Sequence, residues 1–282
     1  MIKELFLLIL SIVMCIVSAG AQVVAPAMSP TATVHQQIGF TNIEVTYSRP
    51  SARDRAIFGE KGVVRFGELW RTGANVATKL TVSEDITLVN TSVPKGEYAI
   101  LSRIESQHWT LLLYLYESRN WQSYTDATPA IEVTAPLVNL PYSTETFTIG
   151  IEDIQLDEAS LVLRWDQTEA RFSVQTEVHQ RMMTTIDRAM AGPSRNDYFQ
   201  AALYLHEAQT DLERALAYIQ EVTKHDDALF FQVYREALIL ADLDQNEEAI
   251  KAAKRSKKLS EVAGNTDLAR LNKQLIQRLA NE

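Results

Sequence analysis

Cysteine is almost absent from this sequence. The single one, Cys15, lies in an apolar run near the N-terminus. Residues 22–282 therefore offer no disulfide, no thiolate metal site and no cysteine nucleophile. The 282 residues, 46% of them hydrophobic, suffice for two domains that are each stabilised by a core alone.

Motifs of familiar chemistry are missing as well. The histidines are scattered and show no H-E-x-x-H or other ligand spacing: His35, His108, His179, His206 and His225. No G-x-S-x-G elbow, P-loop or dinucleotide fingerprint occurs. We therefore expect no metal and no cofactor.

Positive charge is in deficit. The chain has 27 Lys and Arg against 36 Asp and Glu, a net charge of −9. Nucleic-acid binding needs a basic face, so this balance argues against a nucleic-acid partner. Otherwise the acidic excess indicates solubility and little else.

The N-terminus has the pattern of a secretory signal peptide. Lys3 precedes a nearly uninterrupted apolar run over residues 5–17, and Ala19-Gly20-Ala21 forms an A-x-A cleavage pattern. The apolar run is shorter than the ~20 residues that a membrane span needs, although a retained anchor is the alternative. The sequence thus predicts a signal peptide over residues 1–21, a periplasmic or extracellular location, and no stable membrane anchor after cleavage. Together with the lack of cysteine, this favours a bacterial envelope protein.

Residues 32–178, after a linker over 22–31, read as strands. Ile43, Val45 and Tyr47 share one face of such a strand, and similar alternation recurs to residue 174. Nine or ten short strands, punctuated by turns and without a helical pattern between them, predict an antiparallel β-sandwich or jelly roll. A flattened barrel is the alternative.

The periodicity becomes helical after residue 178. We expect a linker and helix start over 179–194 and an all-α helical domain over 195–282, with helices at 196–208, 211–223, 226–243, 246–262 and 266–280. Asp211, Asp226 and Asn246 stand at N-cap positions. The second and fourth helices match at an offset of 34 residues, which is typical of tetratricopeptide repeats. A protein or peptide partner would bind the concave face of such a domain.

The most distinctive stretch runs from residue 47 to residue 78, between two predicted strands. It contains five arginines, among them Arg49, Arg53, Arg55 and Arg71. Guanidinium groups bind planar anions, and a neighbouring indole or amide can orient the ligand. The candidate ligand-binding residues are Arg49, Trp70, Arg71, Thr72, Asn75 and Thr78. In the alternative, the arginines pair with the chain's own acids (Glu44, Asp54, Glu68 or Asp85), and this is the favoured interpretation for Arg53 and Arg55.

Two further features have both a functional and a structural interpretation. Trp121 and Tyr124, in the polar segment 117–128, would either stack on a sugar or peptide or pack the loop onto the sheet. The basic residues between 251 and 258 are spread around a helix, which favours a solvated face over a patch for an acidic partner.

Several runs resemble the signature of one bacterial family. They are YSRP at 47–50, R-x-IFG at 55–59, WRTGAN-x-AT at 70–78 and P-x-G-x-YA at 94–99. Over about residues 29–178 the chain resembles domain of unknown function 2911. The resemblance implies a secreted or periplasmic β domain, sometimes followed by helical repeats, and it implies no activity.

Three hypotheses about function remain open at this point. The first is a binding module for a small anionic or carbohydrate-like ligand. The second is an envelope hydrolase in which Arg71 and Asn75 stabilise developing charge and a carboxylate such as Glu68 is the base. The third is that the signature only maintains the fold.

Overall fold

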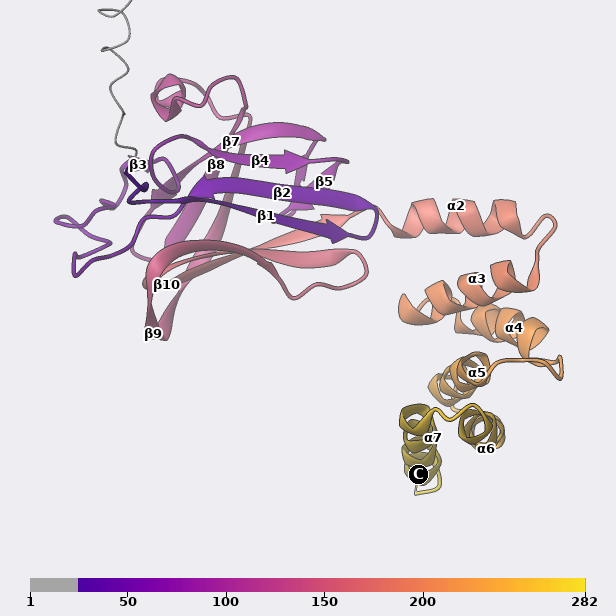
Figure 1. Cartoon of the computed structure of the whole chain (residues 1–282). Helices are drawn as coiled ribbons and strands as arrows, with labels where there is room; N and C mark the ends of the chain where they lie inside the picture. The colour runs from indigo at the N-terminus through magenta and orange to yellow at the C-terminus, as the bar shows by residue number, and fades with distance from the viewer. Residues whose placement is uncertain (1–24, 282) are drawn as a thin grey trace, which may run out of the picture.

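The computed structural model describes residues 25–281. The predicted signal peptide, residues 1–21, lies outside this range. The described part consists of a large antiparallel β domain followed by six α-helices (Figure 1).

Ten strands make up the β domain. Their order in the sheet is β1-β2-β4-β7-β8-β9-β10-β5-β6, and the short β3 pairs with β7. The strands are β1 (Thr31–Ile38), β2 (Thr41–Ser48), β3 (Leu69–Trp70), β4 (Thr78–Val82), β5 (Ile86–Leu88), β6 (Thr91–Val93), β7 (Gly96–Ile104), β8 (His108–Leu115), β9 (Ile131–Glu152) and β10 (Glu158–Thr176).

Two long strands, β9 and β10, join the two halves of the sheet. The first part of β9 pairs with β8, and its remainder pairs with β10, which continues the sheet to β5 and β6. The sequence predicted several short strands here, which is wrong. Pro136 is paired with His108 within the strand. Pro141 lies where the register shifts, between Asn139, which pairs with Thr168, and Thr144, which pairs with Asp166. Neither proline ends β9, because the backbone of proline can be extended and its missing N–H is tolerated at a bulge.

An aromatic cluster fills the core of the β domain. Trp109, Trp165 and Phe147 have no exposed surface. Trp70 lies against them, with its ring stacked on Trp165 at 5.7 Å and edge-on to Phe147 at 5.0 Å. The alternation predicted from residues such as Val45 is confirmed, since Ile43, Val45 and Tyr47 are all buried on one face of β2.

The helices are α2 (His179–Ala189), α3 (Arg195–Glu207), α4 (Leu212–Thr223), α5 (Phe230–Asp242), α6 (Asn246–Val262) and α7 (Thr266–Leu279). Asp211 caps α4 as predicted, because its carboxylate accepts a hydrogen bond from the Arg214 N–H. The other two predicted caps are wrong. Asn246 is already the first residue of α6, whose N-cap position is Gln245. At Asp226, a turn closed by the Ala228 N–H and the His225 carbonyl comes first, and α5 begins at Phe230.

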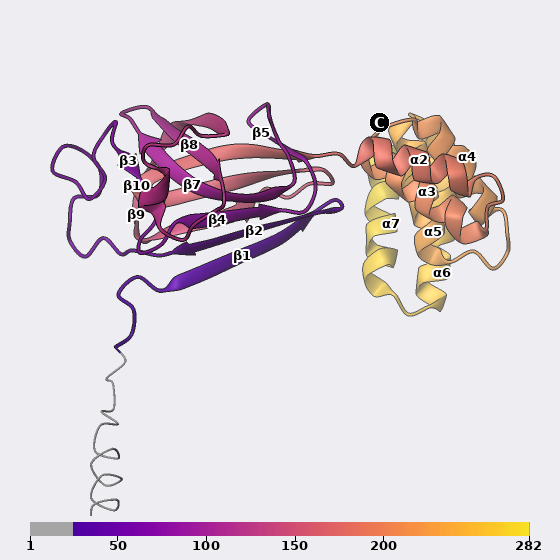
Figure 2. The ribbon, with the colours of Figure 1, turned by 90° about the horizontal axis from the view of Figure 1, so that it is seen from above.

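The helices lie beyond one end of the β domain and do not cover its sheet (Figure 2). The chain passes from β10 into α2 through Glu177 and Val178, and Val178 is buried in the helical core. Within residues 25–281, no helix is long and apolar enough to cross a membrane.

Candidate functional site

The loop between β3 and β4 carries Arg71 and Asn75 and has an unusual backbone. Thr72 and Asn75 have φ values of +53° and +60°, and Gly73 has a φ of +145°. A Cβ on Gly73 would come within 2.8 Å of the Ser48 carbonyl oxygen, so this position needs glycine for close approach to β2. The loop is therefore fitted tightly against the end of β2.

Buried hydroxyl groups hold this backbone in place. A positive φ is strongly disfavoured for a β-branched residue such as Thr72. The Thr72 Oγ1 lies 2.6 Å from the Ser102 Oγ, and the Thr78 hydroxyl donates a hydrogen bond of 2.6 Å to the Thr72 carbonyl. Thr72 and Thr78 are fully buried and Trp70 is 8% exposed. These three predicted site residues thus support the loop from inside the fold.

Arg49 is bonded to the opposite half of the sheet. Its Nε donates to the Phe147 carbonyl at 3.2 Å, and its Nη2 donates to the Thr148 hydroxyl at 2.8 Å. Asn75, although exposed, donates from its amide to the Ser29 carbonyl at 3.0 Å. Both side chains therefore already have partners within the protein.

Four of the five arginines of this stretch bind carbonyl or hydroxyl oxygens rather than acids, the exception being Arg65. Arg53 donates to the Met28 carbonyl, and Arg55 donates to the carbonyls of Ser51 and Ala52. Among residues 25–281, the guanidinium groups of Arg49, Arg53, Arg55 and Arg71 form no ion pair with a carboxylate. The interpretation that Arg53 and Arg55 pair with acids of the chain is therefore wrong. No carboxylate neutralises the charge of these four arginines.

Arg71 is the least constrained of the four. Its only hydrogen bond to the described residues is a long one, 3.5 Å from Nη1 to the Asn75 carbonyl. The guanidinium instead lies over the indole of Trp121, 5.2 Å from the ring centroid. Both side chains are half-buried. Stacking leaves the guanidinium edge free to donate hydrogen bonds in its plane.

Trp121 is positioned by a turn that several hydrogen bonds close. It begins the short 3₁₀ helix Trp121–Tyr124, which is capped by the Asn120 side chain. The Tyr124 hydroxyl accepts from the N–H of Ser118 at 2.7 Å and donates to its carbonyl at 2.8 Å. This turn lies beside the β3–β4 loop, because the Ala77 N–H donates to the Arg119 carbonyl at 2.9 Å.

The turn covers a small second core on the outer face of the sheet. Tyr114 and Tyr124 pack there with their ring centroids 5.4 Å apart, together with Leu101 and Leu112. Burial raises the pKa of the Tyr114 phenol above its ordinary value.

The structure thus joins Arg71 and Asn75 to Trp121, which the sequence analysis treated as a separate feature. Arg49, Trp70, Thr72 and Thr78 surround this group as buried or bonded supports. The signal for Trp121 was an aromatic residue in a polar loop, but its pairing with Arg71 depends on the order of the strands. Glu68, the base named for a hydrolase, is exposed and paired with Arg65.

No metal site is formed by the part of the chain that the structure describes, where no three His, Asp or Glu residues gather in a way that could hold an ion.

The comparisons with known proteins give one match. The family model described as protein of unknown function (DUF2911) matches residues 29–174, slightly more than half of the chain. No curated protein and no solved structure matches.

Proposed function

The chain belongs to the DUF2911 family, whose function is unknown, and we propose that its β domain is a binding module for a small anionic ligand. The ligand would bind at the Arg71–Trp121 surface, defined here as Arg71, Asn75 and Trp121. The observation that carries the proposal is the guanidinium of Arg71, stacked on Trp121 and without a carboxylate partner among the described residues.

The indole fixes the guanidinium in one orientation. Stacking on a tryptophan contributes about 0.5–1 kcal/mol at an exposed site and uses no N–H group. A carboxylate, sulfate or phosphate could therefore accept two parallel hydrogen bonds from the free edge of Arg71. The strained backbone at Thr72 supports the same interpretation, because such conformations concentrate at binding sites.

Acidic sugars fit this surface better than inorganic anions do. The Asn75 amide is exposed beside Arg71 and offers an acceptor oxygen to a hydroxyl group. Trp121 is half-buried, so part of its indole faces solvent next to the guanidinium. The carboxylate of a uronic acid would bind Arg71, and the edge of its sugar ring would contact the exposed part of the Trp121 indole.

Tryptophan fluorescence tests the proposal. The other three tryptophans, Trp70, Trp109 and Trp165, lie in the core, so a ligand at this surface should change the emission of Trp121 alone. We expect oligomers of galacturonic acid to change the emission with saturation, and neutral galactose oligomers to have no effect. Arg71→Gln should weaken the binding at least about tenfold, since a hydrogen bond to a charged group contributes about 1.5–3 kcal/mol.

Arg65→Gln is the matched control, because Arg65 belongs to the same stretch but is exposed and paired with Glu68. It should bind as the wild type does. Equal binding by the Arg71 and Arg65 variants, or no saturable change with any acidic sugar, would refute the proposal.

We propose further that the helices form tetratricopeptide-like repeats. The starts of α4 and α6, Leu212 and Asn246, are 34 residues apart. The aligned alanines Ala215 and Ala249 are both fully buried, as close helix packing requires. Replacing Ala249 by Leu should lower the melting temperature of the helices strongly, whereas Ala263→Leu at an exposed position should not.

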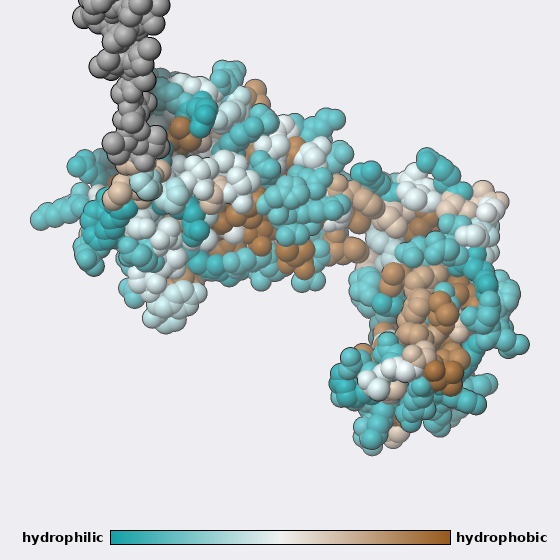
Figure 3. Space-filling model, in the orientation of Figure 1, coloured by the Kyte–Doolittle hydropathy of each residue, from teal (hydrophilic) through white to brown (hydrophobic). Residues whose placement is uncertain are grey.

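The same helices are proposed to bind a protein or peptide partner. Hydrophobic residues gather on one face of the helical part near α5 (Figure 3). Leu229 and Phe231, at the start of α5, are 49% and 41% exposed. Replacing Leu229 by Ser should reduce binding of any partner identified by crosslinking in the native host, while the melting temperature stays unchanged. Phe231 is kept in this test, because its ring packs on Phe199 with the centroids 5.6 Å apart.

Export of the chain is proposed from the sequence of its first residues. Mass spectrometry of the protein isolated from the cell envelope should find Gln22 at its N-terminus. An N-terminus at Met1 would contradict it.

A further inference from the structure

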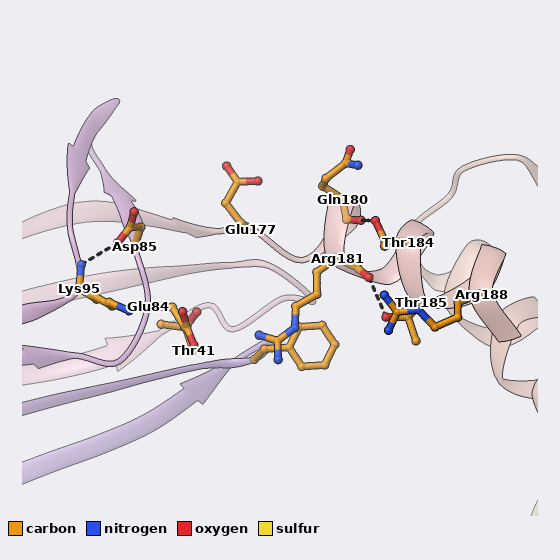
Figure 4. A pocket seen from close by; sticks show the side chains of 11 residues that line it. Thr41, Glu84, Asp85, Lys95, Glu177, Gln180, Arg181, Thr184, Thr185 and Arg188 are labelled. Atoms are coloured by element: carbon orange, nitrogen blue, oxygen red, sulfur yellow. Dashed lines mark hydrogen bonds between the residues drawn. The ribbon is translucent and has the colours of Figure 1, made fainter.

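A second cleft lies at the junction of the two domains, away from the Arg71–Trp121 surface. It separates the end of the β domain from α2 and has a volume of about 790 Å³ (Figure 4). Small-molecule sites commonly measure about 300–1,000 Å³ and occur preferentially at domain interfaces. We call it the interdomain cleft.

The two walls of the cleft carry net charges of opposite sign. Glu84, Asp85 and Glu177, together with one base, Lys95, come from the β domain and the segment that leaves it. Arg181 and Arg188 come from α2. Among residues 25–281, none of these six side chains forms an ion pair. A mainly acidic wall therefore faces a basic wall across the cleft.

Contacts with other protein groups hold two of the charged side chains in place, Asp85 and Arg181. The Asp85 carboxylate accepts a hydrogen bond of 2.8 Å from the Lys95 backbone N–H. Arg181 reaches across the cleft and stacks on Phe40 in the β1–β2 turn, with its guanidinium carbon 4.5 Å from the ring centroid. That stacking again leaves the guanidinium edge available for a carboxylate.

The remaining lining suits amide groups. Thr184 and Thr185 donate their hydroxyl protons to carbonyls of α2, at 2.9 Å in both cases, so their oxygens remain as acceptors for N–H groups. Gln180 and Thr41 also line the cleft. A ligand with two oppositely charged ends and an amide-rich body would satisfy all of these groups.

From this arrangement we propose that the interdomain cleft binds a short zwitterionic peptide. The peptide ammonium group is held by the acidic wall around Glu84, and its terminal carboxylate is held by Arg181 and Arg188. The proposal does not depend on the function assigned to the Arg71–Trp121 surface.

Calorimetric titration with trialanine and two blocked forms tests it. Acetylation removes the ammonium charge and amidation removes the carboxylate charge. We expect trialanine to bind with a Kd in the millimolar range or lower. Each blocking group should raise this Kd about tenfold, because it removes one charge-assisted hydrogen bond.

Variants assign each end of the peptide to one wall. Arg181→Gln should weaken the binding of trialanine. It should have little further effect on the binding of the amidated peptide, which has no terminal carboxylate for Arg181. Glu84→Gln should likewise weaken the binding of trialanine but have little further effect on the acetylated peptide, which has no ammonium group for Glu84. Arg270→Gln and Glu213→Gln, at exposed positions of α7 and α4, are the controls and should bind as the wild type does.

Three results would overturn the proposal. The first is no heat with trialanine in the millimolar range, and the second is equal binding of all three peptides. The third is X-ray scattering that shows the free wild type, but not Arg181→Gln, becoming more compact at low salt, with no response to peptide.

Discussion

Gly39 and Val178 are in direct contact across the domain junction: a Cβ on Gly39 would lie only 2.2 Å from the Val178 Cγ2. Gly39 turns the chain between β1 and β2 with a φ of +55°, and Val178 is the last residue before α2. Because Val178 is also part of the helical core, this contact connects the two domains. It places Phe40 beside α2 and so sets one edge of the interdomain cleft.

Gly39→Ala should therefore destabilise the protein by two separate effects. A non-glycine residue at positive φ costs about 1–2 kcal/mol, and the added methyl group must also displace Val178. Gly67→Ala is a matched control, because Gly67 has a φ of +75° with nothing within 4 Å of its Cβ position. Chemical denaturation of both variants measures the difference, and equal losses would show that Val178 moves aside without cost.

Thr78→Val should destabilise the β domain while preserving its shape. The substitution removes the hydroxyl that donates to the Thr72 carbonyl and leaves that buried oxygen without its donor. We expect a loss of about 1–3 kcal/mol in the free energy of unfolding. Thr110→Val, at an exposed cross-strand pair with Thr134, should change it by less than about 0.5 kcal/mol. A Thr78 variant as stable as the Thr110 variant would show that water replaces the lost bond.

Arg164→Gln should have a larger effect on stability than its surface position suggests. Arg164 binds Glu152 with both nitrogens of its fork, at 2.5 and 2.7 Å, and also pairs with the buried Glu169. Removing it leaves Glu169 with Arg171 alone, at 2.6 Å. We expect a loss below the about 3–5 kcal/mol of a fully uncompensated buried charge but above about 1 kcal/mol. Thermal or chemical denaturation measures it, and a loss within 0.5 kcal/mol, roughly that of an ordinary surface change, would contradict it.

Sequence patterns predicted the helices better than the strands, for a local reason. Helix α4 begins after the cap formed by Asp211, and such a cap involves residues that are close in the sequence. The length of β9 was missed, since Pro136 and Pro141 resemble strand ends until the partner strands and the bulge are known. The break before α5 was missed because Asp226 satisfies the pattern of a cap, while its turn continues to Ala228.

The candidate site was likewise predicted where it depends on adjacent residues and missed where it depends on the tertiary structure. The WRTGAN run drew attention to Arg71 and Asn75, and the family match covers them. Trp121 lies 50 residues from Arg71 in the sequence, so their contact arises only from the pairing of β3 with β7 and of β7 with β8. The hydrogen-bond partners of the arginines also depend on the tertiary structure. A backbone carbonyl such as that of Phe147 cannot be recognised as a partner in the sequence, because every residue has one.

Acid should destabilise the protein partly through Glu152. Its hydrogen bonds with Arg164 hold the pKa of the Glu152 carboxyl below the ordinary value of 4.5, against the opposing effect of burial. In the unfolded chain the carboxyl has its ordinary pKa, so as the pH falls the unfolded state takes up the proton first. The stabilisation is therefore complete above about pH 4.5 and is lost as the pH falls through the lower pKa of the folded state.

The Arg164→Gln variant tests this sign. Its pKa for Glu152 should return toward 4.5, so its stability should depend less steeply on pH below that value than the wild type's does. Arg270→Gln, whose partner Asp267 is exposed, should keep the steep dependence of the wild type. Denaturation curves between neutral pH and the acid transition measure all three slopes. Parallel slopes in the wild type and Arg164→Gln would show that other carboxylates cause the acid unfolding.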